Sequence, residues 1–167
     1  MTPKFAPYET DATPIYVVEK AGFGDWLDQQ DTRISNWVTQ SGFTAKLGAH
    51  SLVPDADGRI AMVPAGYGDA DARDRGRFHL ATVAKALPEG TYRMDNLPED
   101  RLEEESLGWL LAGYAFDRYH TQSPAKATLV APDGIDAPRL ETIAAGEALT
   151  RDLINTPTSD MGPTQLE

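Results

Sequence analysis

The order of its predicted elements makes this chain an α/β domain with a mixed β-sheet flanked by helices. Short apolar runs typical of strands alternate with segments whose apolar residues recur at helical spacing. One Asp-Gly pair lies between two apolar stretches and predicts an antiparallel hairpin, so the sheet is expected to be mixed. A chain of 167 residues, 41% of them hydrophobic, has the size and composition of one globular domain with a core.

The first third of the chain predicts a strand, a helix and a hairpin. Residues 14–18 are β-branched and aromatic, as in a buried strand. Residues 26–41 place Ile34, Trp37 and Val38 on one helical face. The hairpin consists of the apolar stretches 43–53 and 60–64, which flank the Asp-Gly turn.

The rest of the chain continues the alternation of helices and strands. The expected elements are a loop at 65–69, a helix at 73–87, a strand at 91–94, a helix from 96 to about 119, a strand at 126–131 and a helix at 139–154. Proline 88 ends the first of these helices. The acidic cluster 103–105 lies near the start of the second, where carboxylates favour the helix dipole.

Charge and composition exclude several classes of partner. Acidic side chains outnumber basic ones by 26 to 15, and the net charge of −11 repels phosphate backbones, which argues against nucleic acid. No apolar run approaches the ~20 residues that cross a bilayer, and the first residues do not resemble a signal peptide. The chain has no cysteine, which excludes disulfides and thiolate chemistry. These features favour a cytoplasmic protein that does not insert into a membrane.

The histidines and serines do not form a catalytic or metal-binding pattern. His50, His79 and His120 lack the i, i+4 spacing and the neighbouring glutamate of a zinc-binding helix. We expect His50 in a strand, His79 beside the apolar face of a helix and His120 at a helix end. None of the serines lies in a G-x-S-x-G motif. The sequence therefore predicts no catalytic, cofactor-binding or metal-binding residue.

The aspartate groups are explained by turns and helix starts. Asp69, Asp71 and Asp74 form a D-x-D-x-x-D cluster that lacks the turn glycine and distal glutamate of a calcium loop. A solvated loop that leads into a helix N-terminus is the simpler interpretation. Asp55 and Asp57 lie at the hairpin turn, as turn-forming residues do.

A phosphate site is conceivable in the 65–69 loop, because Gly66-Tyr67-Gly68 lies between a predicted strand and a predicted helix. The segment lacks the third glycine and the lysine of longer phosphate loops, so a tight connection is the simpler interpretation.

The large aromatic side chains are expected mostly in the core, with one or two at an interface with another domain. They are Trp26, Trp37, Trp109, Tyr114, Phe116 and Tyr119.

Three segments carry a resemblance to a known family. The most specific is the run from Leu149 to Pro157 followed by Asp160-Met161-Gly162-Pro163-Thr164, which resembles a junction between two domains. Residues 108–119 contain a G-x-Y-x-F-x-x-Y type pattern at a helix end, and residues 79–92 are similar to the helix, Leu-Pro turn and strand before it. All three resemble the leucyl aminopeptidases of the cytosol aminopeptidase family, over roughly residues 60–167.

The resemblance implies a macro-domain-like three-layer sandwich over residues 1–138, and a linker helix with the start of a catalytic domain over residues 139–167. In that family, the catalytic domain holds two divalent metal ions, zinc or manganese, and the enzyme forms a homo-hexamer. A ligand glutamate lies within an Asn-Thr-Asp-Ala-Glu-Gly-Arg motif. Here Asn155-Thr156 is followed by proline, so no catalytic or metal residue carries over to this chain.

The chain is therefore expected to be the non-catalytic N-terminal domain of a metal-dependent leucyl aminopeptidase, inactive alone. Its partner would be its own C-terminal catalytic domain, and its role assembly or regulation. The alternative is a macro-domain-like module that binds ADP-ribose or another nucleotide through the 65–69 loop. A stand-alone interaction protein is the third interpretation.

Overall fold

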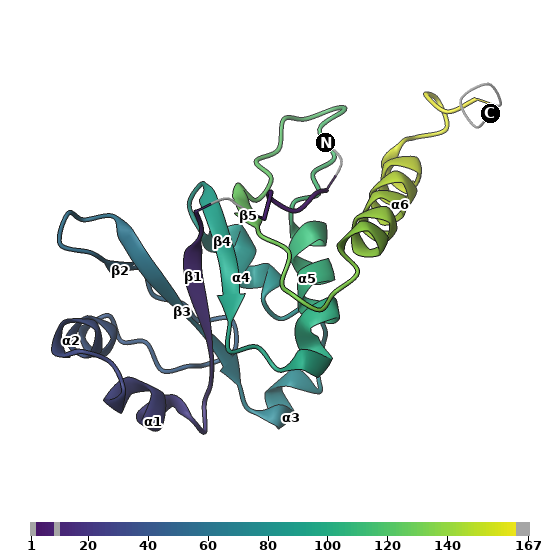
Figure 1. Cartoon of the computed structure of the whole chain (residues 1–167). Coiled ribbons are helices and arrows are strands. Elements are labelled where there is room, and N and C mark those ends of the chain that lie inside the picture. The colour runs from purple at the N-terminus through teal and green to yellow at the C-terminus, as the bar shows by residue number, and fades with distance from the viewer. Residues whose placement is uncertain (1–2, 9–10, 163–167) are drawn as a thin grey trace.

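A five-stranded sheet in the order β2-β3-β1-β4-β5 forms the centre of the domain in the computed structural model, which describes residues 3–8 and 11–162 (Figure 1). The strands are β1 (Thr13–Glu19), β2 (Val53–Pro54), β3 (Ile60–Gly68), β4 (Gly90–Asp95) and β5 (Ala127–Leu129). β1 pairs in parallel with β3 and β4, and β4 with β5, whereas β2 is antiparallel to β3. The sheet is mixed, and the predicted fold class is confirmed.

Helices cover the sheet from both sides and make the domain a three-layer structure. They are α1 (Phe23–Asp28), α2 (Thr32–Gln40), α3 (Ala70–Arg73), α4 (Ala81–Ala86), α5 (Glu99–Ala112) and α6 (Ala137–Asn155). Successive residues of β1 point to opposite faces, as in any strand. Val17 joins the core beneath α4 and α5, and Val18 joins the core that contains Val38 of α2.

Two helices that the sequence predicts as single segments are each divided. Residues 26–41 contain the end of α1 and all of α2, because the Asp31 side chain accepts a 2.8 Å hydrogen bond from the Ile34 N–H and caps a new helix. Residues 73–87 contain the end of α3 and then α4. Between these helices, Phe78 has a φ of 58°, a left-handed conformation that interrupts helical geometry.

The hairpin is confirmed, but its first strand is shorter than predicted. Most of the stretch 43–53 is irregular, and only β2 and an isolated bridge between His50 and Ala65 pair with β3. Ala45 and Gly48 have φ angles of 51° and 78°, which an extended strand does not accommodate.

Helix α5 ends at Ala112, although the sequence predicts a helix to about residue 119. The chain leaves the helix axis after the C-cap residue Gly113, and the Tyr114 hydroxyl then donates a 2.8 Å hydrogen bond to Asp152 Oδ1 of α6. The aromatic pattern at 114–119 therefore belongs to a loop against α6, not to a helical face.

Helix α6 packs on α5 and then projects from the body of the domain (Figure 1). Its buried residues, Leu140 and Ala144, lie against Leu110 of α5. No helix within the described residues is long and apolar enough to cross a membrane. Part of the predicted junction, residues 163–167, lies outside the described residues.

Candidate functional site

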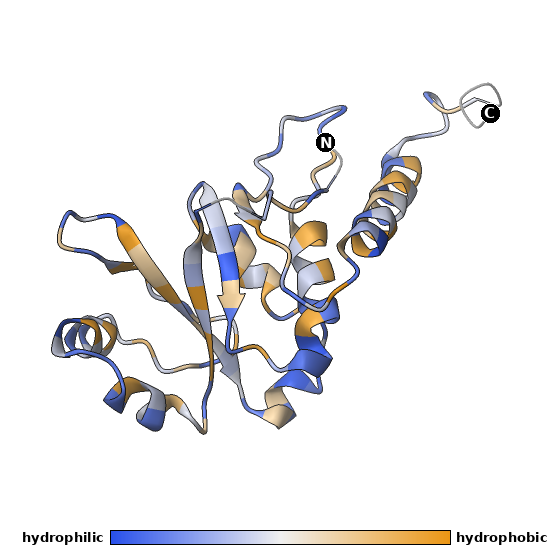
Figure 2. Ribbon diagram, in the orientation of Figure 1, coloured by the Kyte–Doolittle hydropathy of each residue, from blue (hydrophilic) through white to orange (hydrophobic). Residues whose placement is uncertain are grey.

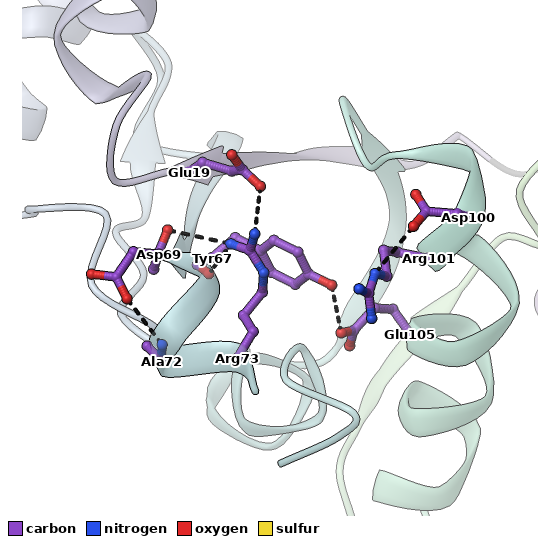
Figure 3. A network of polar contacts seen from close by, with 9 residues as sticks. Glu19, Tyr67, Asp69, Ala72, Arg73, Asp100, Arg101 and Glu105 are labelled. Carbon is purple, nitrogen blue, oxygen red and sulfur yellow. Dashed lines mark hydrogen bonds and ion pairs between the residues drawn. The ribbon is translucent and has the colours of Figure 1, made fainter. Parts of the chain in front are cut away.

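Open α/β sheets usually bind ligands at the carboxyl ends of their parallel strands. The preferred place lies between two neighbouring strands whose following helices cover opposite faces of the sheet. β1 and its neighbours β3 and β4 are such strands. The chain runs from β1 to α1 and α2 on one face, whereas β3 and β4 lead to helices on the other face. The edge between β1 and β3 is therefore the candidate site (Figure 3).

This edge is filled by the side chain of Arg73. Its guanidinium group lies 2.9 Å from Glu19 Oε1, and it donates a 3.0 Å hydrogen bond to the carbonyl of Tyr67 (Figure 3). The same group lies 4.6 Å from the centre of the Tyr67 ring, in a cation–π contact. Beside it, Lys20 pairs with Asp69 at 3.5 Å. The charged groups of the edge therefore bind one another across β1, β3 and α3.

Glu105 lies beneath this edge and is 1% exposed. The Tyr67 hydroxyl donates a 2.9 Å hydrogen bond to Oε1 (Figure 3). The Leu80 N–H donates a 2.9 Å hydrogen bond to Oε2. Burial, and then the negative charge of Glu105, raise the pKa of the Tyr67 phenol well above its usual value. Through these bonds, Glu105 of α5 holds β3 and the start of α4, which is a structural role.

Sequence reasoning missed this buried carboxylate, because the cluster 103–105 looks like the solvated start of a helix. The helical spacing between Glu105 and later apolar residues does indicate its burial. Glu105 precedes the buried residues Trp109 and Ala112 by four and seven positions, which places it on the core face of α5.

The buried Tyr67–Glu105 pair predicts a loss of stability in alkali. The raised pKa means that the folded protein keeps the Tyr67 proton, whereas the unfolded chain releases it above pH 10.0, its ordinary value. The contribution of the pair to the free energy of unfolding is thus fully present below pH 10. Above that pH it is lost by about 1.4 kcal/mol per pH unit. In urea unfolding from about pH 9 to about pH 11, Tyr67→Phe should show a shallower decline than the parent. Tyr8→Phe, at an exposed position, is the control, and equal slopes for Tyr67→Phe and the parent would contradict the assignment.

The 65–69 segment is not the loop that the sequence predicts, since residues 60–68 form the single strand β3. The Gly66 N–H donates to the Ala49 carbonyl at 2.7 Å, and the Gly68 N–H donates to the Ala45 carbonyl at 3.0 Å. A Cβ on Gly66 would lie 2.1 Å from the carbonyl oxygen of Lys46. Gly66 thus allows a close approach of backbone, and its N–H group is already bonded.

The aspartates occupy the structural positions that the sequence predicts. Asp69 caps α3 by accepting a 2.9 Å hydrogen bond from the Ala72 N–H, and this bond lowers the pKa of Asp69. Asp71 and Asp74 are exposed beside it. Asp55 accepts hydrogen bonds from the N–H groups of Asp57 and Arg59, as a turn residue does.

The histidines lie apart from one another, and two predictions of their local structure are wrong. His79 lies in the turn before α4, with its ring edge-on to Tyr67 at 5.9 Å, and His120 is exposed beyond the end of α5. His50 forms the isolated bridge to Ala65, in line with its predicted strand-like position. Among the described residues, no group of three or more His, Asp or Glu side chains could hold a metal ion.

Two cavities lie at the β4–β5 side of the sheet. One, of about 530 Å³, contains Arg93, which donates a 2.6 Å hydrogen bond to the Ala12 carbonyl and pairs with Asp95 at 3.4 Å. The other, of about 400 Å³, lies between the N-terminal segment and α5 and is lined largely by apolar groups, among them Phe5 and Trp109. The basic group of the first cavity is thus already bound by the protein.

These features define an α/β domain whose sheet edge is closed by its own ion pairs. Comparison with known proteins identifies its family. Residues 13–132 match the model of the "M17 aminopeptidase, N-terminal domain". The chain belongs to the M17 aminopeptidase family and corresponds to the N-terminal domain of its members.

Similar proteins are considerably longer than this chain. A probable cytosol aminopeptidase of Brucella anthropi is 28% identical over 96% of this chain, which spans 38% of that protein. The crystal structure of a cytosol aminopeptidase from Coxiella burnetii is similar with a TM-score of 0.83 and 31% identity, over 95% of this chain and 34% of that one. The bottromycin maturation enzyme BotP, at 22% identity and a TM-score of 0.62, shares the fold.

Proposed function

We propose that this chain is the non-catalytic N-terminal domain of a metal-dependent leucyl aminopeptidase. In this proposal, a following domain of the same polypeptide removes N-terminal amino acids from peptides with two divalent metal ions, zinc or manganese. The observation that supports it most strongly is the match of residues 13–132 to the N-terminal domain of the family. The chain also spans little more than a third of the cytosol aminopeptidases that it resembles. Their names support a cytosolic location.

The chemistry of the sheet edge is consistent with a non-catalytic role. A two-metal hydrolytic site needs several carboxylates that converge on the ions and activate a water. Here Glu19 pairs with Arg73, Asp69 binds Lys20 and the Ala72 N–H, and Glu105 accepts two hydrogen bonds in the core. These carboxylates are committed to holding β1, β3, α3, α4 and α5 together.

The chain by itself is expected to show no aminopeptidase activity. Purified residues 1–167, incubated with leucine p-nitroanilide and Mn²⁺, should release nitroaniline no faster than buffer, because the metal ligands belong to another domain. The longer polypeptide that contains this chain, assayed in parallel, is the positive control. Turnover by residues 1–167 that grows with protein concentration and survives repurification would contradict the proposal.

The nucleotide-binding alternative depended on free N–H groups in the 65–69 segment. Those of Gly66 and Gly68 donate to the carbonyls of Ala49 and Ala45, so they are not available to a phosphate group. The homo-hexamer and the domain boundary at 138/139 stay predictions. Sedimentation of the longer polypeptide tests the first, and limited proteolysis tests the second.

A further inference from the structure

Within the described part of the chain, helix α6 contacts the domain mainly along one side. In its first half, Leu140 and Ala144 pack against Leu110 of α5. In its last turns the same side meets Tyr114, whose ring lies 5.4 Å from the Arg151 guanidinium group and whose hydroxyl bonds to Asp152 and accepts from Asn155. The attached face is therefore apolar at its start and polar at its end.

A second apolar face of α6 points to solvent. Up to residue 153 its members recur at spacings of three and four residues, and the last member follows directly, so that all of them lie on one broad side of the helix. They are Ile143, Gly146, Leu149, Leu153 and Ile154, here called the outer stripe. Leu149 is 60% exposed and Ile154 is 77% exposed, and space within 4 Å of a Cβ at Gly146 is open. Figure 2 shows hydrophobic segments alternating with hydrophilic ones along the projecting helix.

Such a two-sided helix is typical of a buried position. A surface helix normally has one apolar stripe and an opposite polar face, whereas a helix apolar on opposite sides lies between two packed bodies. Contiguous exposed apolar residues at a soluble domain's surface usually mark an interaction site. The outer stripe is thus expected to have a partner.

We infer that the outer stripe of α6 is the docking surface for the domain that follows it in the aminopeptidase polypeptide. The inference rests on the proposed function. The relatives extend well beyond the length that this chain matches, and α6 lies after residues 13–132, which match the N-terminal domain. A second copy of this chain is a poorer occupant, because each copy carries a net charge of −11 and the two would repel.

Two tyrosines fix the direction in which α6 presents this stripe. Tyr114 bonds to Asp152 near the end of the helix, and Tyr119 donates a 2.5 Å hydrogen bond to Asp160 beyond it. The loop after α5 thereby holds both the helix end and the segment that leaves it. The following domain would meet the outer stripe in one orientation instead of on a freely swinging helix.

Thiol labelling tests the docking surface directly, because the chain contains no cysteine of its own. Leu149→Cys is prepared in residues 1–167 and in the longer polypeptide, and the rate of maleimide attachment at position 149 is measured by peptide mass spectrometry. If the following domain covers position 149, the thiol should react at least about tenfold more slowly in the longer polypeptide than in residues 1–167. Asp57→Cys, in the exposed hairpin turn, is the matched control and should react equally in both proteins.

Equal rates at position 149 in the two proteins would overturn the inference while leaving the proposed function intact. A reading frame that encodes no further domain would instead overturn the proposed function, and the inference with it. Slow labelling already in residues 1–167, together with a dimer in sedimentation, would assign the stripe to a second copy and also overturn it.

A double charge substitution distinguishes an effect on docking from an effect on folding. The variant Leu149→Glu/Ile154→Glu should leave the melting temperature of residues 1–167 unchanged, because both side chains are exposed there. In the longer polypeptide the same pair should accelerate proteolytic cleavage at residues 156–160 severalfold. Unchanged cleavage would count against the docking surface.

Discussion

Replacing Glu105 by alanine is expected to destabilise the domain by about 3 kcal/mol, since each buried polar group left without a partner costs about 1–3 kcal/mol. The Tyr67 hydroxyl and the Leu80 N–H would both lose their acceptor inside the core. The loss would be seen in urea unfolding of residues 1–167 followed by tryptophan fluorescence, as a lower midpoint with an unchanged slope.

Two controls separate the buried carboxylate from acidic residues in general. Glu104→Ala removes a neighbour that pairs with Arg77 near the surface and should cost under about 1 kcal/mol. Glu105→Gln keeps the side-chain shape and one carbonyl acceptor. Its loss of stability should therefore lie between those of Glu104→Ala and Glu105→Ala. The assignment of Glu105 as a link between β3, α4 and α5 is wrong if Glu105→Ala is no more harmful than Glu104→Ala.

Gly66→Ala is expected to be equally damaging, with a loss of about 3 kcal/mol at the upper end of the range for overpacked sites. The new Cβ would lie 2.1 Å from the Lys46 carbonyl oxygen and 2.7 Å from the Ala45 carbonyl carbon. Both are backbone atoms and cannot rotate away, so the 45–46 segment would have to separate from β3. Thermal unfolding by circular dichroism measures the change.

Gly146→Ala is the matched control, because a Cβ there meets nothing within 4 Å. Alanine in an exposed helix should leave stability unchanged or raise it by up to about 1 kcal/mol. Parent-like stability of Gly66→Ala would mean that the close approach of the 45–46 backbone to β3 does not exist. The 65–69 segment would then again be an adaptable loop.

Sequence patterns predicted the elements whose signal is local and repeated. The β-branched run at 14–18, the strand at 91–94 and the long helix at 139–154 are confirmed as β1, β4 and α6. The alternation of these elements was sufficient for the fold class. These features depend on periodic burial, which a single sequence displays directly.

The errors concern features that depend on distant neighbours. Gly66 looked like a turn residue, but its role is to admit the 45–46 backbone against a strand. Glu105 looked solvated, but Tyr67 and Leu80 make its burial favourable. No local pattern shows either partner, because each lies at least twenty residues away in the chain.

Some of the aromatic residues lie in the core as expected, whereas others are exposed. Trp109 is 3% exposed and donates its indole N–H to the Ala127 carbonyl, as expected of a core residue. Trp37 and Tyr119 are 46% and 52% exposed, although the core was the expected place for most of the aromatics. Tyr119 belongs to the loop that holds the segment after α6, and an interface between one or two of the aromatics and another domain stays a prediction.

The central proposal is that the metal ligands of the parent enzyme lie in a domain outside residues 1–167, and its most direct test is a measurement of bound metal. Residues 1–167 and the longer polypeptide are dialysed against Mn²⁺ or Zn²⁺, and the metal per chain is determined by atomic emission. We predict no stoichiometric metal on residues 1–167 and two ions per chain on the longer polypeptide. A stoichiometric ion retained by residues 1–167, and lost on substitution of carboxylates within them, would contradict the account.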